Sequence, residues 1–346
     1  MKVRKTMFRR IYFSVCGEGY GHSSRDMAVA KELSKEGAIV LMGSYGYVLE
    51  RLKKSFDVIE VKREFEMIGN GGAFDLKATI SQSKSQALQF SKIISHEKKI
   101  MEDFNATCVV ADGRTAAVLA AFKLGIPCVI ISNQTSLENF FKERKFLLRF
   151  IGKQVEFTLK TTFMLSEIVL IPDFLPPHTV CLNSLSKDKH VLKKQVFIGP
   201  IVSIEEKSGS KTDDMKRPYI LTLLGGHMFR LPIFTAILKI ADRFPYIDFL
   251  IFTKFKSNNV PKNVIIREFA EDISVYMQNA DLIITQAGHS TAMEILALGK
   301  PALIIPDEGQ VEQENNASRM RELGVCETLE YITLEPESLF QRSVSF

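Results

Sequence analysis

Residues 281–320 read DLIITQAGHSTAMEILALGKPALIIPDEGQVEQENNASRM. In this stretch two short apolar runs, LIIT and ALIIP, are each followed by a polar turn and then by a segment of helix length. Apolar runs of this length that alternate with helical patterns are typical of buried strands in a parallel sheet covered by helices. The stretch therefore predicts a strand-helix-strand-helix unit of an α/β fold.

The same alternation runs through the rest of the chain in two blocks, separated by a polar stretch that is rich in charged and small residues. With 346 residues the chain has room for roughly two domains. We predict two doubly wound, Rossmann-like α/β domains with a cleft between them. The first comprises residues 1–200, the second residues 218–333, the linker residues 201–217, and a C-terminal segment residues 334–346.

Composition narrows the class of protein. The chain is 46% hydrophobic and 25% charged with a formal net charge of +5, which is typical of a globular protein, and no nucleic-acid-binding pattern stands out. No apolar stretch reaches the roughly 18 residues of a membrane span, and the five cysteines are scattered without metal-binding spacing. We therefore expect a cytoplasmic protein that binds no nucleic acid.

The sequence GEGYGH, residues 17–22, follows the predicted strand IYFSV. Its glycines permit a tight turn and bring backbone N–H groups near a ligand, and a helix is expected to begin near Ser23 or Ser24. The pattern is not the GxGxxG of dinucleotide sites, so a purely structural turn remains an alternative. His22 favours a catalytic interpretation, because an imidazole beside a helix N-terminus is well placed as a general base. The predicted acceptor side comprises Gly19, Gly21 and Asn133.

Asp112 ends the predicted strand CVVAD. Because the carboxyl ends of parallel strands share one edge of the sheet, we expect Asp112 to lie near His22 and to orient its imidazole. The alternative is that Asp112 only caps the turn ADGR. Glu18 is a competing base, and the sequence leaves the choice between Glu18 and His22 open.

In the second block, QAGHST, residues 286–291, follows the strand LIIT. A helix is expected there with Ser290 or Thr291 as its N-cap, and the amides of its first turn, with the helix dipole, would bind a pyrophosphate. Glu294 would accept hydrogen bonds from a ribose diol, unless it only completes a capping box. Since a helix N-terminus stabilises negative charge, a nucleotide diphosphate could leave without a metal ion.

Three polar residues, Glu312, Gln313 and Asn316, follow the next predicted strand at the start of a helix. Carboxylate and amide groups accept and donate the hydrogen bonds that sugar hydroxyls make. The segment is therefore a candidate sugar-binding element.

GHSTAMEILALGKP followed by EQENNA, residues 312–317, resembles the donor-binding half of GT-B glycosyltransferases. The resemblance is to the branch that adds N-acetylglucosamine to a lipid-linked peptidoglycan precursor and to the wider UDP-sugar transferases. In that family a Gly-Ser/Thr helix start with a Glu, a Gly-x-Pro turn and a (D/Q)QxxNA element recur in this order. GEGYGH and LLGGH, residues 223–227, match glycine-rich turns of the two family domains, so the resemblance covers both halves of the chain.

The resemblance implies a GT-B fold, no cofactor, and transfer of a sugar from a UDP-linked donor to a hydroxyl of a glycan, a lipid-linked molecule or a small molecule, with inversion at the anomeric carbon. It implies that residues 334–346 pack back on the first domain. It also implies contacts to the diphosphate from Gly225, Gly226, His227, Gly288, His289, Ser290 and Thr291.

In the same family Glu294 would hold the ribose, and the backbone of Phe269 would read the base. Glu312 and Gln313 would contact the sugar. Glu312 stands where the family more often has a neutral residue or an aspartate, and the LGGHMF loop lacks the usual serine. The choice between a hexose and an N-acetylhexosamine therefore stays open.

Residues 139–165 mix six phenylalanines with six basic residues. An apolar face beside a basic one is typical of a helix that lies on an anionic membrane surface. The alternative is that the apolar side chains pack on the sheet and the charges are solvated. The segment predicts membrane association on the inner face.

Two other functional classes are compatible with these patterns. A nucleotide-sugar 2-epimerase shares the two-domain fold, and a non-catalytic nucleotide-sugar-binding protein would bind the donor without transferring the sugar. An epimerase would convert the donor without an acceptor, so an assay without acceptor separates it from a transferase.

Overall fold

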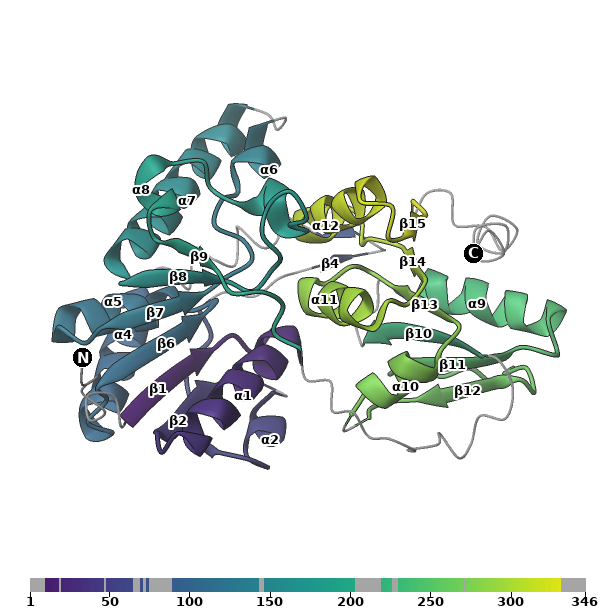
Figure 1. Cartoon of the computed structure of the whole chain (residues 1–346), viewed down its shortest axis with the longest axis horizontal. Coiled ribbons are helices and arrows are strands. Elements are labelled where there is room, and N and C mark those ends of the chain that lie inside the picture. Colours follow the sequence, from purple (N-terminus) through teal and green to yellow (C-terminus); the bar gives the residue numbers. More distant parts are fainter. Residues whose placement is uncertain are drawn as a thin grey trace. The chain divides into compact units, whose positions relative to one another are not determined.

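A computed structural model describes residues 10–18, 20–46, 48–64, 69–70, 73–74, 89–142, 146–202, 219–225, 230–270 and 272–330. The chain forms two compact units, Met1–Met67 with Leu76–Val202 and Ile68–Asp75 with Ser203–Phe346 (Figure 1). Most of the predicted linker and the whole of the predicted C-terminal segment lie outside the described residues. The predicted domain limits therefore stay predictions.

The first unit is a seven-stranded parallel sheet with the strand order β3-β2-β1-β6-β7-β8-β9. Its strands are β1 (Arg10–Val15), β2 (Ile39–Ser44), β3 (Asp57–Glu60), β6 (Cys108–Asp112), β7 (Cys128–Ile131), β8 (Ile168–Ile171) and β9 (Gln195–Phe197). Its helices are α1 (Tyr20–Lys35), α2 (Val48–Leu52), α4 (Phe90–Asp103), α5 (Thr115–Leu124), α6 (Glu138–Lys142), α7 (Phe146–Leu165) and α8 (Lys189–Leu192), with a 3-10 turn at Cys181–Ser184.

Both faces of this sheet are apolar, which is why helices cover both. Along β1, Ile11 and Phe13 pack with Leu52 of α2, whereas Tyr12 points to the other face and packs with residues of α4 and α5 such as Met101. Side chains alternate between the two faces of a strand, so one strand supplies both cores. This is the doubly wound arrangement that the alternating pattern predicts.

The second unit is a six-stranded parallel sheet with the order β12-β11-β10-β13-β14-β15. Its strands are β10 (Tyr219–Gly225), β11 (Asp248–Thr253), β12 (Val264–Arg267), β13 (Leu282–Thr285), β14 (Ala302–Ile304) and β15 (Glu327–Thr328). Its helices are α9 (Leu231–Arg243), α10 (Ser274–Asn279), α11 (His289–Leu298) and α12 (Val311–Glu322). A short antiparallel pair, β4 (Gly69–Asn70) and β5 (Ala73–Phe74), belongs to this unit. The sequence pattern indicated neither β9 nor β15.

Two helices begin earlier than the sequence predicted. Helix α1 begins at Tyr20, and the hydroxyls of Ser23 and Ser24 donate to the Tyr20 carbonyl at 2.9 Å, so both serines lie inside the helix and not at its start. Helix α11 begins at His289 with Gly288 as its N-cap, so the prediction of Ser290 or Thr291 was wrong. In the described part of the chain every helix is too short or too polar to cross a bilayer.

Candidate functional site

The predicted acceptor-side residues follow strands that are neighbours in the first sheet. Strand β1 lies between β2 and β6, so the chain leaves β1 for one side of the sheet and later returns to the other. Ligands of open α/β sheets bind beyond the carboxyl ends of the strands at such a switch point. Val15 at the end of β1 pairs with Asp112 at the end of β6, and Asp112 pairs with Ile131 at the end of β7.

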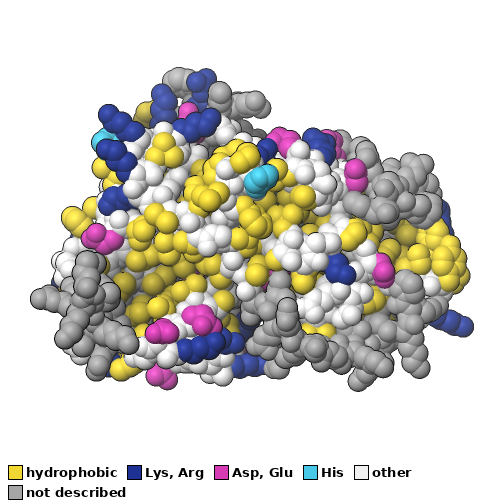
Figure 2. Space-filling model, viewed as in Figure 1, with side chains coloured by type: hydrophobic (Ala, Val, Ile, Leu, Met, Phe, Trp, Pro, Cys, Tyr) yellow, Lys and Arg dark blue, Asp and Glu magenta, His cyan; other side chains and the backbone are white. Residues whose placement is uncertain are grey.

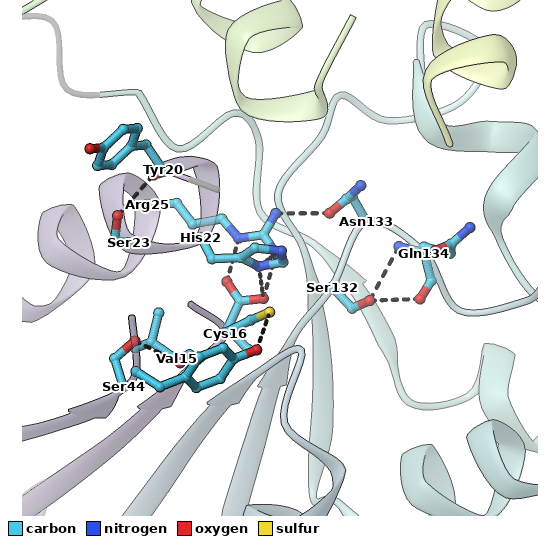
Figure 3. A network of polar contacts seen from close by, with 12 residues as sticks. Val15, Cys16, Tyr20, His22, Ser23, Arg25, Ser44, Ser132, Asn133 and Gln134 are labelled. Carbon is cyan, nitrogen blue, oxygen red and sulfur yellow. Dashed lines mark hydrogen bonds and ion pairs between the residues drawn. The ribbon is translucent and has the colours of Figure 1, made fainter. Parts of the chain in front are cut away.

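His22 and Asp112 are in direct contact, as the sequence predicted. The His22 Nδ1 lies 2.7 Å from Asp112 Oδ1 (Figure 3). Burial alone would raise the pKa of the Asp112 carboxyl, but the charge of Arg25 and the contacts with His22 outweigh burial and hold that pKa below its usual range. An ionised carboxylate only accepts hydrogen bonds, so His22 donates through Nδ1, and in the neutral imidazole Nε2 then carries the lone pair.

The exposure of the two side chains suits a base and the group that orients it. The side chain of His22 is 30% exposed and that of Asp112 is 1% exposed. Gly113 follows with φ 66°, and a Cβ there would lie 2.9 Å from Cys16 Cβ and 3.6 Å from His22 Cε1. Only glycine combines this backbone conformation with so close an approach. Because its carboxylate binds His22 and Arg25, Asp112 does more than cap the turn that follows it.

Arg25 was not predicted as a site residue, but it contacts three residues that were, His22, Asp112 and Asn133. Its Nε and Nη2 donate to Asp112 Oδ2 and Oδ1, each at 2.5 Å, and its Nη1 donates to Asn133 Oδ1 at 2.8 Å (Figure 3). Its Nη2 also lies 3.1 Å from His22 Nδ1. Both nitrogens carry hydrogens, so they share Asp112 Oδ1 as acceptor. The helical spacing from His22 to Arg25 is one turn and was a signal that could have identified it.

The other predicted acceptor-side residues stand as follows. Glu18, the competing base, lies 3.2 Å from Arg63 Nε through its Oε1. Gly21 lies in the first turn of α1, and Gly19 lies outside the described residues. The choice between Glu18 and His22 stays a prediction, which the contact between His22 and Asp112 supports.

In the second unit, the N-terminus of α11 follows β13 through a strained turn. Ala287 has φ 65°, and Gly288 takes the N-cap position without a side chain to bond the first amides. The first intrahelical bond of this turn runs from Ala292 N to Gly288 O at 3.0 Å. Amides before that point are directed along the helix axis, and a Cβ on Gly288 would meet nothing within 4 Å. An anion could approach here.

This start of α11 removes the capping-box interpretation of Glu294. With Gly288 as N-cap the third helical residue is Thr291, so Glu294 lies beyond the position from which a side chain could close the box. Glu294 is half-buried. Its predicted contact with the ribose stays a prediction.

Asn316 and Gln313 make contacts inside the second unit. Asn316 is buried, and its Nδ2 donates to the carbonyl of Ala287 at 3.0 Å, which holds the turn before α11. Gln313 is also buried; its Oε1 accepts from Asp307 N at 2.9 Å and its Nε2 donates to Asp307 Oδ2 at 3.0 Å. Glu312 is half-buried in the first turn of α12. The predicted sugar contacts of Glu312 and Gln313 stay predictions.

Arg230 and Asp307 are further residues that the sequence reading did not single out. Arg230 Nε lies 3.0 Å from both carboxylate oxygens of Asp307, and its Nη1 donates to Leu224 O at 2.7 Å. Gly225, beside Leu224, has φ 62°. Asp307 comes shortly after β14, and polar residues beyond strand ends were the available signal.

The remaining donor-side residues are placed less completely. Phe269 follows β12 and is 46% exposed. His289 is buried at the first position of α11, followed by Ser290 and Thr291. Gly226 and His227 lie outside the described residues.

Comparison with known proteins places these two units in a family. The profile described as Glycosyl transferase family 1 matches residues 9–342, so the chain belongs to this family. An uncharacterized glycosyltransferase of Methanosarcina mazei is 35% identical over 342 residues, covering 96% of this chain and 88% of the relative. The protein is therefore a glycosyltransferase, and its two parallel-sheet domains form the GT-B fold.

Two further comparisons bear on the predicted resemblance. A UDP-N-acetylglucosamine--N-acetylmuramyl-(pentapeptide) pyrophosphoryl-undecaprenol N-acetylglucosamine transferase of Bacillus thuringiensis is 26% identical over 354 residues, covering 96% of this chain and 88% of that protein. The crystal structure of the kitacinnamycin glycosyltransferase superposes with a TM-score of 0.70 at 16% identity, covering 97% of this chain and 90% of that one. The predicted family and fold are confirmed.

Proposed function

We propose that the protein transfers a hexose or an N-acetylhexosamine from a UDP-linked donor to an acceptor hydroxyl, with inversion and without a metal ion. The observation that carries the proposal is the contact between His22 Nδ1 and Asp112 Oδ1 at 2.7 Å, which leaves Nε2 of a part-exposed imidazole as a base. A base in this state suits the removal of a hydroxyl proton.

The reaction follows from this arrangement as a single displacement. Nε2 of His22 takes the proton of the acceptor hydroxyl while the acceptor oxygen bonds to the anomeric carbon. The bond from that carbon to the nucleotide diphosphate breaks on the opposite side, and the diphosphate leaves with the electron pair. Asp112 stays ionised and stabilises the imidazolium that forms.

The donor side rests on the start of α11. The amides of its first turn and the positive end of the helix dipole would stabilise the charge on the departing diphosphate. Glu294 would bind the ribose and Glu312 with Gln313 the sugar, and Phe269 would lie beside the base. The UDP assignment is supported by the Bacillus thuringiensis relative, which is named as a transferase that uses UDP-N-acetylglucosamine.

A lipid-linked acceptor fits helix α7. Phe150 and Phe157 are 58% and 69% exposed and lie two turns apart on one side of the helix, with the exposed Arg149 and Lys153 beside them. Figure 2 shows basic side chains gathered over α7 and α8. Glu156 is the single acidic residue of α7, and its carboxylate accepts from Leu137 N at 2.8 Å. A basic surface with exposed aromatic side chains favours an anionic membrane.

Not all of the predicted membrane segment has this character. Phe141 and Phe163 are buried, so part of residues 139–165 packs inside the first unit, as the alternative interpretation held. The side chains of Phe140 and Phe146 lie outside the described residues. The proposed membrane surface is therefore limited to the exposed side of α7.

A panel of UDP-, GDP- and dTDP-linked sugars tests the donor. A ligand that binds only the folded state raises thermal stability in proportion to the logarithm of its concentration over its Kd. We expect the largest shift from a UDP-sugar. We also expect acceptor-dependent release of UDP, which His22→Ala should slow strongly and the surface variant His190→Ala should leave unchanged. Stabilisation by GDP- or dTDP-sugars alone would contradict the UDP assignment, and donor conversion without acceptor would favour an epimerase.

Sedimentation with lipid vesicles tests the membrane surface. The protein should sediment with vesicles that contain an anionic lipid and less with neutral ones. The double substitution Phe150→Ser and Phe157→Ser should lower the bound fraction. Phe122→Ser is the matched control, since Phe122 is 59% exposed but lies on α5. Equal loss in the control and the α7 variant would contradict the proposed surface.

A further inference from the structure

Asp26 is a buried acid that the proposed reaction does not use. It lies on α1 one turn after His22 and next to Arg25, and its side chain is fully buried. In the described part of the chain, neither of its carboxylate oxygens meets a hydrogen-bond donor. An ionised carboxylate buried without donors is strongly disfavoured.

Two charged groups, Asp112 and Arg25, act on Asp26. The Asp112 carboxylate on β6 acts on the Asp26 carboxyl both through its charge and as a hydrogen-bonding group. Arg25 on α1 is the cation that acts on both acids, while Arg51 from α2 meets α1 at Ser24 Oγ, 2.8 Å away. From the end of β1 the only titratable neighbour described near Asp112 is the Cys16 thiol.

With His22 neutral, as its role as a base requires, the charges of this cluster balance only if Asp26 is neutral. Arg25 carries one positive charge and Asp112 one negative charge, and the bidentate contact between them is already made. A second carboxylate would place an uncompensated negative charge in a buried site, which costs several kcal/mol of free energy. Burial, and then the charge of Asp112, raise the pKa of Asp26 well above its usual range, although Arg25 acts in the opposite direction.

We propose that Asp26 is a positioning residue that keeps its proton at neutral pH and donates a hydrogen bond to the Asp112 carboxylate, which also binds His22. Asp112 then accepts from three side chains, those of His22, Arg25 and Asp26, and its orientation is fixed on every side. No proton leaves Asp26 during the reaction. The catalytic consequence rests on the proposed function of His22, whereas the protonation state does not.

Infrared difference spectroscopy tests the protonation state directly. The spectrum of wild type minus Asp26→Asn at a pH about three units above an ordinary aspartate pKa should contain the carbonyl band of a protonated carboxyl, shifted in heavy water. The matched control is wild type minus Asp242→Asn, which removes an exposed carboxyl. A difference spectrum with only carboxylate bands for Asp26 would overturn the proposal, whatever reaction the protein catalyses.

Steady-state kinetics tests the positioning role. Asp26→Leu removes the donor and should lower kcat about tenfold with little change in the KM for the donor. Asp26→Asn restores a neutral N–H donor at the same place and should recover most of the lost kcat. The acid limb of its pH-rate profile should lie at the same pH as in the wild type. An acid limb displaced in Asp26→Asn, or a loss as large as in Asp26→Leu, would mean that a charge is required there and would overturn the proposal.

Discussion

Replacing Asp26 by Asn should change how the free energy of unfolding depends on pH. In the unfolded chain an aspartate titrates near pKa 3.9, so above about pH 5 it is ionised. If Asp26 keeps its proton in the folded protein up to neutral pH, as we propose from its burial and its raised pKa, folding takes up one proton. The unfolded state then binds one proton fewer than the folded state, and the free energy of unfolding falls by about 1.4 kcal/mol per pH unit.

The sign of this contribution is opposite to that of a paired carboxylate. The stability that Asp26 contributes is fully present below its unfolded pKa and is lost as the pH rises towards its folded pKa. Asparagine does not titrate, so Asp26→Asn lacks this loss. From about pH 5 to about pH 7 the variant should gain about 3 kcal/mol relative to the wild type. Asp112, whose pKa is lowered, stays ionised in this range and adds no slope.

Urea denaturation of both proteins at three pH values in this range measures the difference. The quantity to compare is the free energy of unfolding of Asp26→Asn minus that of the wild type, because other titrating groups cancel in it. Asp242→Asn supplies the background for a carboxyl removed from the surface. A difference for Asp26→Asn that does not grow with pH would refute the reasoning, because it would mean that folding takes up no proton at Asp26.

The other predictions concern contacts in each unit. Arg25→Met or Asp112→Asn alone should lower the free energy of unfolding by about 3 to 5 kcal/mol, because each change leaves a buried charge without its partner. The double variant should lose much less than the sum of the two. Additive losses in urea denaturation would contradict this prediction. Gly152→Ala should lower the free energy of unfolding by about 1 to 3 kcal/mol in the same assay, because the added Cβ would lie 2.3 Å from Phe141 Cγ. Unchanged stability would show that α6 and α7 can move apart to make room for it. Asn316→Asp should weaken UDP binding about tenfold in calorimetry by releasing the turn before α11; an unchanged Kd would show that this turn does not hold the diphosphate.

The fold could be predicted from the sequence because its strands are short, apolar and separated by helix-length segments. LIIT and ALIIP became β13 and β14, with α11 between them. Parallel strands have their carboxyl ends at one edge of the sheet, so the proximity of His22 and Asp112 was predictable from two strand ends, whereas the strand order was not. The edge strand β9 could not be predicted in this way, because its sequence QVF is too short and too exposed to form an apolar run.

Details that depend on side-chain packing could not be predicted. The start of α11 is set by Ala287, whose positive φ is held by a hydrogen bond from Asn316, 29 residues further along the chain. Serine and threonine are preferred N-caps, so the sequence favoured Ser290 or Thr291 as the cap. A positive φ at Ala287 was not expected, because alanine rarely adopts that conformation. Arg25 and Asp26 look like ordinary polar residues of an amphipathic helix until Asp112 is placed beneath them.

A single-turnover rate for His22→Ala, measured together with the Kd for the donor, tests most directly whether this imidazole is the base. We expect the transfer rate to fall about 100- to 10,000-fold, with the Kd for the donor unchanged, since that residue contributes to deprotonating the acceptor and not to holding the nucleotide. A variant that transfers the sugar at the wild-type rate would contradict the account.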